Sequence, residues 1–220
     1  MTSINRQMLV QTLFKFPFYI VTHPFKGFDD MKTEGKHRMF YSIVALVGLL
    51  IATIIKQAYL GFAVTGIYSQ TPNINIIWTL VVVYGPIILF VVANWSITSI
   101  TEGKGTAKEI FYTYCYSLYL NIFCILIATF LSQFVTLNEV AFATFFITFG
   151  QASSLFYLFI GLIIIHEYTF SKAVLMVVMT ILSMMVITFI GALFFSLLNN
   201  VFNFFYIIFS ELHAHYFTGR

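Results

Sequence analysis

The side chains of this sequence that are able to do chemistry gather in short polar stretches. Acidic, basic and histidine residues lie close together between residues 23 and 38, 101 and 109, and 166 and 172. A carboxylate with a positioned basic partner is the usual arrangement for general acid–base catalysis. The candidates are Asp29, Asp30, Glu34, Glu102, His166 and Glu167. Nothing in the sequence supplies the partner and the cleft that a reaction needs, so an enzyme is the weakest of three functional hypotheses.

Two other groups of residues carry metal-ligating side chains. They are His23, Asp30, Glu34 and His37 near the start, and Glu211, His213 and His215 near the end. Asp30 and Glu34 would share one face of a helix, because they are four residues apart. Neither group has the ligand spacing of a structural or catalytic metal site. The sequence therefore predicts no metal, no cofactor and no catalytic residue.

The composition decides which solvent surrounds the chain. Of 220 residues, 60% are hydrophobic and only 9% are charged, whereas soluble domains have about 25% charged residues. The mean hydropathy is +0.93. A water-soluble fold of this composition would expose a large apolar surface. We therefore expect one membrane domain in contact with the lipid bilayer, and the net charge of +3 indicates topology rather than nucleic-acid binding.

Five apolar stretches are long enough to cross a bilayer, which takes about 20 residues each. They cover residues 39–60, 74–100, 111–134, 140–165 and 173–198. The fold class predicted is an all-α, polytopic bundle of five transmembrane helices over 39–198. Residues 1–38 form a cytoplasmic segment whose first part, 2–22, is an amphipathic helix. It lies either in the membrane interface or as a packing helix over the cytoplasmic end of the bundle. The polar stretch 23–38 reads as a solvated surface, and 199–220 as an extracytoplasmic, interfacial extension of the fifth helix.

Particular residues inside the spans predict how the helices pack. Gly85-Pro86 should break or kink the second span, with Tyr84 donating a hydrogen bond inside the bundle. Small residues should let helices approach closely, at Gly150, Ser154 and Gly161 in the fourth span and at Thr188, Ala192 and Ser196, beside Gly191, in the fifth. The uncharged stretch 61–73 reads as an exterior loop.

The lysines and arginines predict the orientation. With five spans, nine of the 11 basic residues fall on one side, and only Lys56 and Arg220 fall on the other. Basic residues are concentrated in cytoplasmic loops. We therefore expect a multi-pass protein of the cell membrane with a cytoplasmic N-terminus and an extracytoplasmic C-terminus.

Four sequence features resemble the Yip1 family of five-span membrane proteins, and most of all its compact bacterial members. They are Pro24-Phe25-Lys26-Gly27-Phe28-Asp29-Asp30-Met31-Lys32-Thr33-Glu34, Tyr84-Gly85-Pro86, Asn94-Trp95 leading to Gly103-Lys104-Gly105-Thr106 and Glu109, and His166-Glu167-Tyr168-Thr169-Phe170. The chain differs from the eukaryotic pattern by Val82-Val83, where that signature has Asp-Leu, and by a short N-terminal segment. The GTPase-binding role of the eukaryotic members is therefore not expected here.

The resemblance implies a non-enzymatic accessory protein, a scaffold or auxiliary subunit, with a membrane-protein partner such as the permeases of an ABC-type sugar importer. The alternative is a small-solute or lipid transporter or channel that uses a broken second span. The oligomeric state stays open. The residues expected to carry interactions are Phe28, Asp29, Asp30, Lys32, Glu34, Tyr84, Gly85, Pro86, Asn94, Glu102, Gly103, Lys104, Gly105, His166 and Glu167.

Overall fold

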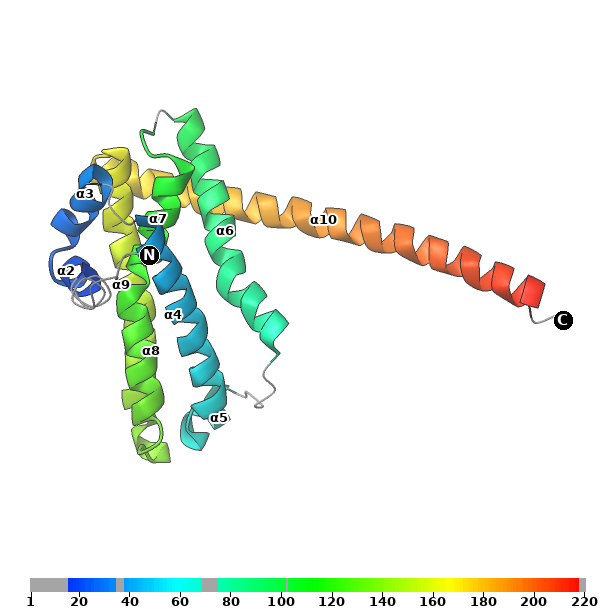
Figure 1. Cartoon of the computed structure of the whole chain (residues 1–220), viewed down its shortest axis with the longest axis horizontal. Coiled ribbons are helices and arrows are strands. Elements are labelled where there is room, and N and C mark those ends of the chain that lie inside the picture. The colour runs from blue at the N-terminus through cyan, green and yellow to red at the C-terminus, as the bar shows by residue number, and fades with distance from the viewer. Residues whose placement is uncertain (1–15, 35–37, 69–74, 102, 218–220) are drawn as a thin grey trace, which may run out of the picture.

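A computed structural model of the chain describes residues 16–34, 38–68, 75–101 and 103–217, which form helices and turns without a strand (Figure 1). Five helical segments are long and apolar enough to cross a membrane. They are Met39–Tyr59, Ile76–Ile100, Ala107–Leu131, Leu137–His166 and Phe170–Leu212. The prediction of an all-α membrane protein with five spans is confirmed.

The first four spans lie side by side as a bundle (Figure 1). Its helices are α4 (Arg38–Tyr59), α6 (Ile76–Ile100), α7 (Ala107–Ser117), α8 (Tyr119–Leu131) and α9 (Val140–His166), with a 3₁₀ turn, η2 (Leu137–Glu139), before α9. The third span is divided, because α7 ends at Ser117 and α8 begins at Tyr119. Thr106 and Glu109 form a capping box at the start of α7, which satisfies two backbone donors there.

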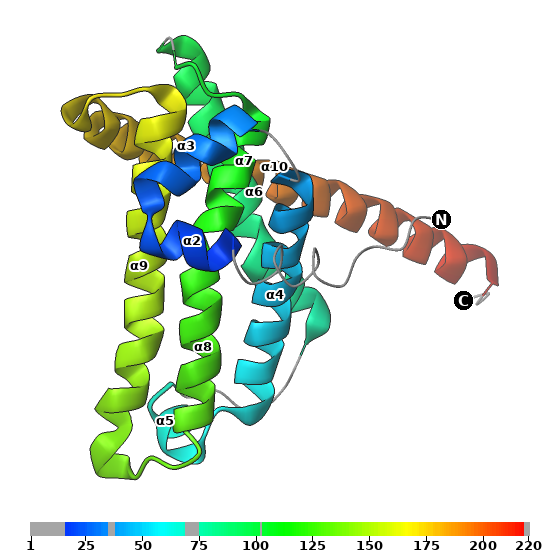
Figure 2. The ribbon, with the colours of Figure 1, turned by 60° about the vertical axis from the view of Figure 1, so that its left-hand side comes forward.

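Two short helices from the N-terminal segment lie across the outside of this bundle (Figure 2). They are α2 (Phe16–Thr22) and α3 (Pro24–Glu34). Pro24 is the first residue of α3, where its missing N–H costs nothing. Phe28 and Met31 are buried against α4, α7 and α9. The prediction that residues 23–38 form only a solvated surface is thus wrong for 24–34, whereas 2–15 of the predicted amphipathic helix fall outside the described residues.

A helix crossing in the core depends on the absence of a side chain at Gly161 of α9. A Cβ atom there would lie 2.3 Å from Cγ2 of Thr113 and 3.1 Å from Cε1 of Phe28. At Gly150, an added Cβ would lie 2.7 Å from Cβ of Cys124. The predicted close approach along the fourth span is confirmed at these two glycines.

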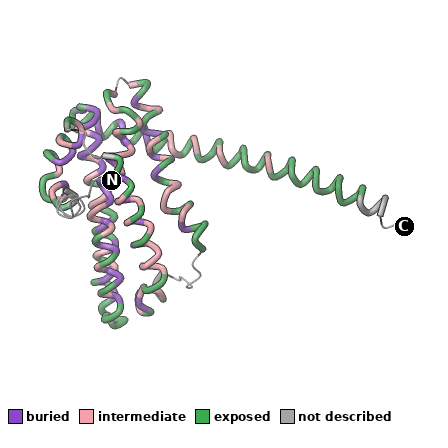
Figure 3. The backbone as a smooth tube through the Cα atoms, viewed as in Figure 1, coloured by how far each residue is buried: buried purple, intermediate pink, exposed green. Residues whose placement is uncertain are grey.

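The fifth span belongs to one long helix, α10 (Phe170–Phe217), of which only the beginning packs against the bundle. Ala173, Met176 and Thr180 are buried, but the residues beyond Met184 are mostly exposed and the helix projects away from the bundle (Figure 3). The packing ridge predicted at Thr188, Ala192 and Ser196 is therefore wrong within this chain, since nothing lies within 4 Å of a Cβ built on Gly191. The helix does continue into 199–217, as expected, while its side of the membrane stays a prediction.

Two further expectations need correction. The exterior loop 61–73 contains a helix, α5 (Phe62–Tyr68), whose Val64 packs against Val140 and Ala143. The second span is not broken, because α6 continues as one helix through Gly85 and Pro86, while the kink expected there stays a prediction. Tyr84 behaves as predicted, since its hydroxyl donates to the carbonyl oxygen of Leu46 at 3.3 Å.

We predict that Gly161→Ala destabilises the protein, by about 1–3 kcal/mol, because the new methyl group overpacks the contact between α3, α7 and α9. The measurement is thermal unfolding of the purified protein in detergent. Gly191→Ala is the matched control, since nothing lies within 4 Å of a Cβ added there, and the substitution should leave the unfolding temperature unchanged or slightly higher. Equal unfolding temperatures for the two variants would contradict the packing described.

Candidate interaction site at one end of the bundle

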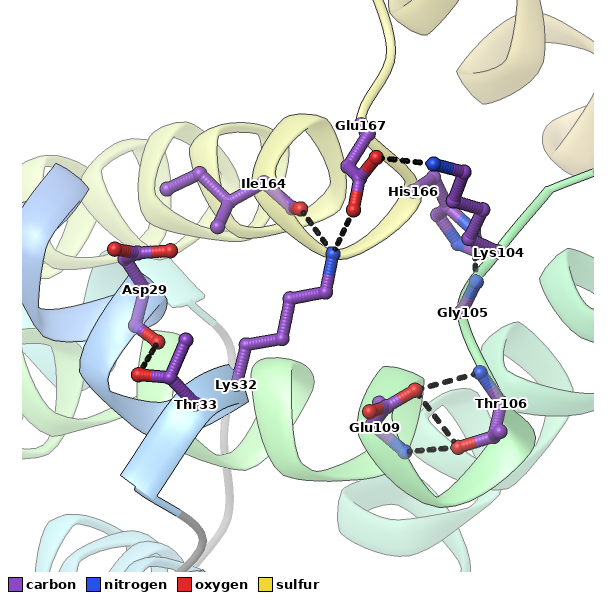
Figure 4. A network of polar contacts seen from close by, with 10 residues as sticks. All are labelled: Asp29, Lys32, Thr33, Lys104, Gly105, Thr106, Glu109, Ile164, His166 and Glu167. Atoms are coloured by element: carbon purple, nitrogen blue, oxygen red, sulfur yellow. Dashed lines mark hydrogen bonds and ion pairs between the residues drawn. The ribbon is translucent and has the colours of Figure 1, made fainter.

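Three segments that are distant in the sequence meet at Glu167, directly after α9 (Figure 4). Lys32 of α3 donates to Oε1 of Glu167 at 2.7 Å, and Lys104 of the loop between α6 and α7 donates to Oε2 at 2.5 Å. Lys32 also donates to the carbonyl oxygen of Ile164 at 3.4 Å. We call Lys32, Lys104 and Glu167 the clamp. One carboxylate therefore ties both lysine-bearing segments to the end of α9.

Glu167 holds an unusual backbone conformation at this position. Its φ of 54° is left-handed, and it is the one non-glycine residue in the described part of the chain with a positive φ. The N–H groups of Glu167 and Tyr168 both donate to the carbonyl oxygen of Ile163, which closes α9. Glycine usually takes this place, and another residue costs about 1–2 kcal/mol. A glutamate here gains two lysine partners, which a glycine would not have.

The two lysines also change the acidity of Glu167. Hydrogen bonds from Lys104 and then from Lys32, together with their positive charges, lower the pKa of this carboxyl group from 4.5 to about 2. Hydrogen bonds to the charged form favour it. Glu167 is thus ionised throughout the physiological pH range, and the clamp is closed there.

His166 forms a second connection one residue earlier. The ring is 2% exposed. Nδ1 accepts from the N–H of Gly105 at 3.1 Å, so the proton is assigned to Nε2, which lies 3.3 Å from Oδ1 of Asn94. Asn94 in turn donates to Oγ1 of Thr180 at 2.9 Å. This chain of hydrogen bonds links α9, α6, the loop before α7 and the beginning of α10.

The loop between α6 and α7 reaches these residues because it carries glycines. A Cβ atom on Gly105 would lie 2.6 Å from Cε1 of His166, and one on Gly103 would lie 2.5 Å from Oη of Tyr168. Tyr168 stacks on His166 with ring centroids 5.0 Å apart, and Nζ of Lys172 lies 4.7 Å from the centre of the Tyr168 ring. The loop backbone therefore lies directly against the aromatic stack.

The structure brings together about half of the residues expected to carry interactions. They are Lys32, Asn94, Gly103, Lys104, Gly105, His166 and Glu167. Six others of this set lie elsewhere in ways that the structure defines. Asp29 is exposed on α3, Asp30 accepts from the hydroxyl of Tyr19 at 3.0 Å, and Phe28 packs in the core. Tyr84, with its neighbours Gly85 and Pro86, lies within α6.

Two of the expected residues have no described side chain, and three participants, Tyr168, Lys172 and Thr180, were not in the expected set. Glu102 and the side chain of Glu34 fall outside the described residues. Thr180 was missed, because nothing in the sequence distinguishes it from the other hydroxyl residues of the same span, Ser183, Thr188 and Ser196. Within the described ranges, no three His, Cys, Asp or Glu side chains come close enough to hold a metal ion.

Comparison with known proteins identifies one matching family. A family model for the Yip1 domain matches residues 18–193, which is most of the chain. No curated protein and no solved structure matches the chain.

We predict that Glu167→Gln loosens α3 from the end of α9 while leaving the fold intact, because Phe28 and Met31 still anchor α3 in the core. The measurement is the distance distribution between spin labels on cysteines placed at the exposed Thr33 and Ser171. The distribution should broaden in Glu167→Gln and stay narrow in Glu211→Gln, which removes an exposed carboxylate far along α10. Identical distributions in all three proteins would show that the clamp does not hold α3.

We further predict that acid opens the clamp. Because the pKa of Glu167 is lower in the folded protein, its contribution to stability is complete above about pH 4.5 and is lost as the pH falls toward 2. The distribution between the same labels should be constant from pH 8 to 5 and should broaden below pH 4.5. Glu167→Gln should show no such change over this window, and an opening between pH 5 and 8 would contradict the assignment.

Proposed function

Because the chain belongs to the Yip1 family, we propose that it is a non-enzymatic accessory protein of the membrane, a scaffold or auxiliary subunit. Its partner is a membrane protein that binds the end of the bundle where the clamp lies. The observation that carries this proposal is the clamp itself. One glutamate, held in a costly backbone conformation, fixes three separate segments into a single surface.

The contacts around the clamp support binding rather than catalysis. Both ring nitrogens of His166 are used in contacts with Asn94 and Gly105, and both carboxylate oxygens of Glu167 are bound to lysines. A general base needs an atom that reaches the proton it removes. Segments that are already fixed before binding lose less conformational entropy when a partner binds, which favours binding.

The outer side of the clamp carries charges of both signs. The side chains of Lys104 and Glu167 are 68% and 49% exposed, and Asp29 lies exposed on the neighbouring α3. Mixed charges at the rim of an interface select the partner and its orientation more than they add affinity. We propose the permease subunits of an ABC-type sugar importer as the partner, on the basis of the resemblance to bacterial Yip1 proteins.

The same proposal includes an orientation. Lys32 and Lys104 bind one carboxylate, so the N-terminal segment and the loop after the second span lie at the same end of the bundle. This supports the tally of basic residues, and we propose that this end faces the cytoplasm of a cell. The transporter alternative has less support, because α6 is continuous where a transporter site would require an unwound helix.

Site-specific photocrosslinking in native membranes tests the partner. A photoreactive amino acid at the exposed Lys26 or Ser171, near the clamp, should give one discrete adduct with an integral membrane protein. The same probe at the exposed Phe142, at the other end of α9, is the matched control and should not give it. The adduct should also weaken several-fold when Glu167→Gln is added, because the surface is then no longer fixed.

Two outcomes would overturn the proposal. One is the absence of any protein adduct from the probes at Lys26 and Ser171 at native expression. The other is the same set of adducts at Phe142 as at the clamp. For the orientation, a cysteine at Lys26 should react with a membrane-impermeant maleimide only after the cells are opened, and reaction in intact cells would contradict a cytoplasmic clamp.

A further inference from the structure

A groove between three helices, lined by none of the clamp residues, has a shape and chemistry that the proposed function does not use. It has a volume of about 550 Å³, within the range of about 300–1,000 Å³ of small-molecule sites. Its walls come from α4, α6 and α7. They are Met39, Ile88, Val91, Val92, Ala107, Lys108, Phe111 and Tyr112.

The groove runs inward from one surface of the membrane. Met39 and Ala107 are the first residues of their spans, so the groove opens where α4 and α7 enter the bilayer. On α7 the lining runs from Ala107 to Tyr112, five residues further on, which is about 8 Å at about 1.5 Å per residue. One leaflet of hydrocarbon is about 15 Å deep. The groove therefore extends through about half of one leaflet.

The polarity of the lining changes along this depth. Ile88, Val91, Val92 and Phe111 give apolar walls at depth, and Tyr112 at the edge directs its hydroxyl toward Sδ of Met39. Lys108 is the one charged residue of the lining, and it lies exposed at the mouth. A cation at the membrane surface above an apolar slot complements a phosphate group joined to an acyl chain.

We propose that this groove binds one phospholipid, with an acyl chain between α4, α6 and α7 and the headgroup phosphate paired with Lys108. A lipid with net negative charge such as phosphatidylglycerol is preferred, because this headgroup carries no ammonium group that would repel the lysine. The occupant is lipid rather than a protein helix, since the slot is short, has Lys108 at its mouth where a headgroup lies, and is bordered by Val92, which is 45% exposed.

Native mass spectrometry of the delipidated full chain in detergent tests this site. Phosphatidylglycerol and phosphatidylcholine are titrated separately, and the fraction of protein carrying one lipid is measured. Phosphatidylglycerol should bind more tightly. Lys108→Gln should weaken it about fivefold, the change expected for one lysine at a lipid surface, whereas Lys26→Gln, which changes an exposed lysine outside the groove, should not.

A second pair of variants tests the apolar part. Val92→Trp fills the groove from its lipid-facing side and should reduce binding of both lipids without lowering the unfolding temperature. Val81→Trp, at a similarly exposed position nearer the other end of α6, should change neither. Equal binding of both lipids together with no effect of Lys108→Gln would overturn the site. Unchanged lipid binding in Val92→Trp would also overturn the site. Displacement of the lipid by inorganic phosphate would indicate a phosphate site instead, and a dimer that Val92→Trp dissociates would indicate that a second copy of the chain occupies the groove.

Discussion

The end of α9 is the point on which the arrangement of the other segments depends. Its last residue, His166, reaches into the bundle, and the next residue, Glu167, turns outward in a left-handed conformation to accept from two lysines. At this turn the N–H groups of Glu167 and Tyr168 end the helix on the carbonyl oxygen of Ile163. The turn lets one dipeptide bind the core with one side chain and the surface with the other.

The hydrogen bonds around His166 and Glu167 follow from the burial of the groups that make them. Asn94 and His166 are buried, and a buried polar group without a hydrogen-bond partner is costly. The carbonyl oxygen of Ile164 accepts from Lys32, and Asn94 is bound on both sides, by His166 and Thr180. The loop must then come close enough for the N–H of Gly105 to reach the imidazole, which explains the glycines on either side of Lys104. The hydrogen bond of each of these residues therefore depends on the position of its neighbour in the chain of contacts.

The sequence was sufficient for those features that hydropathy and local stereochemistry determine. Five spans, their approximate limits and the small residues at Gly150 and Gly161 could be predicted because a membrane helix needs length, apolar side chains and close contacts. The cluster of charged and histidine residues was also recognised. The pairing of particular residues within the cluster was not predicted, because Lys32 and Glu167 are far apart in the chain and neither local sequence pattern specifies the other residue. Phe28 was placed in a polar stretch whose burial depends on Gly161.

Uncharged and charged polar side chains occupy different parts of the bundle. Asn94, Thr98, Thr113, Asn121 and Thr180 are buried within spans, and all are uncharged. The charged members of the clamp lie at helix ends or in a loop, and Lys56 is in the last turn of α4. Pathways for ions and protons normally carry ionisable residues inside the bundle. In this bundle Asn94 links α6 to Thr180 of α10 and to His166 of α9, and the charged side chains of Lys104 and Glu167 lie exposed at one end.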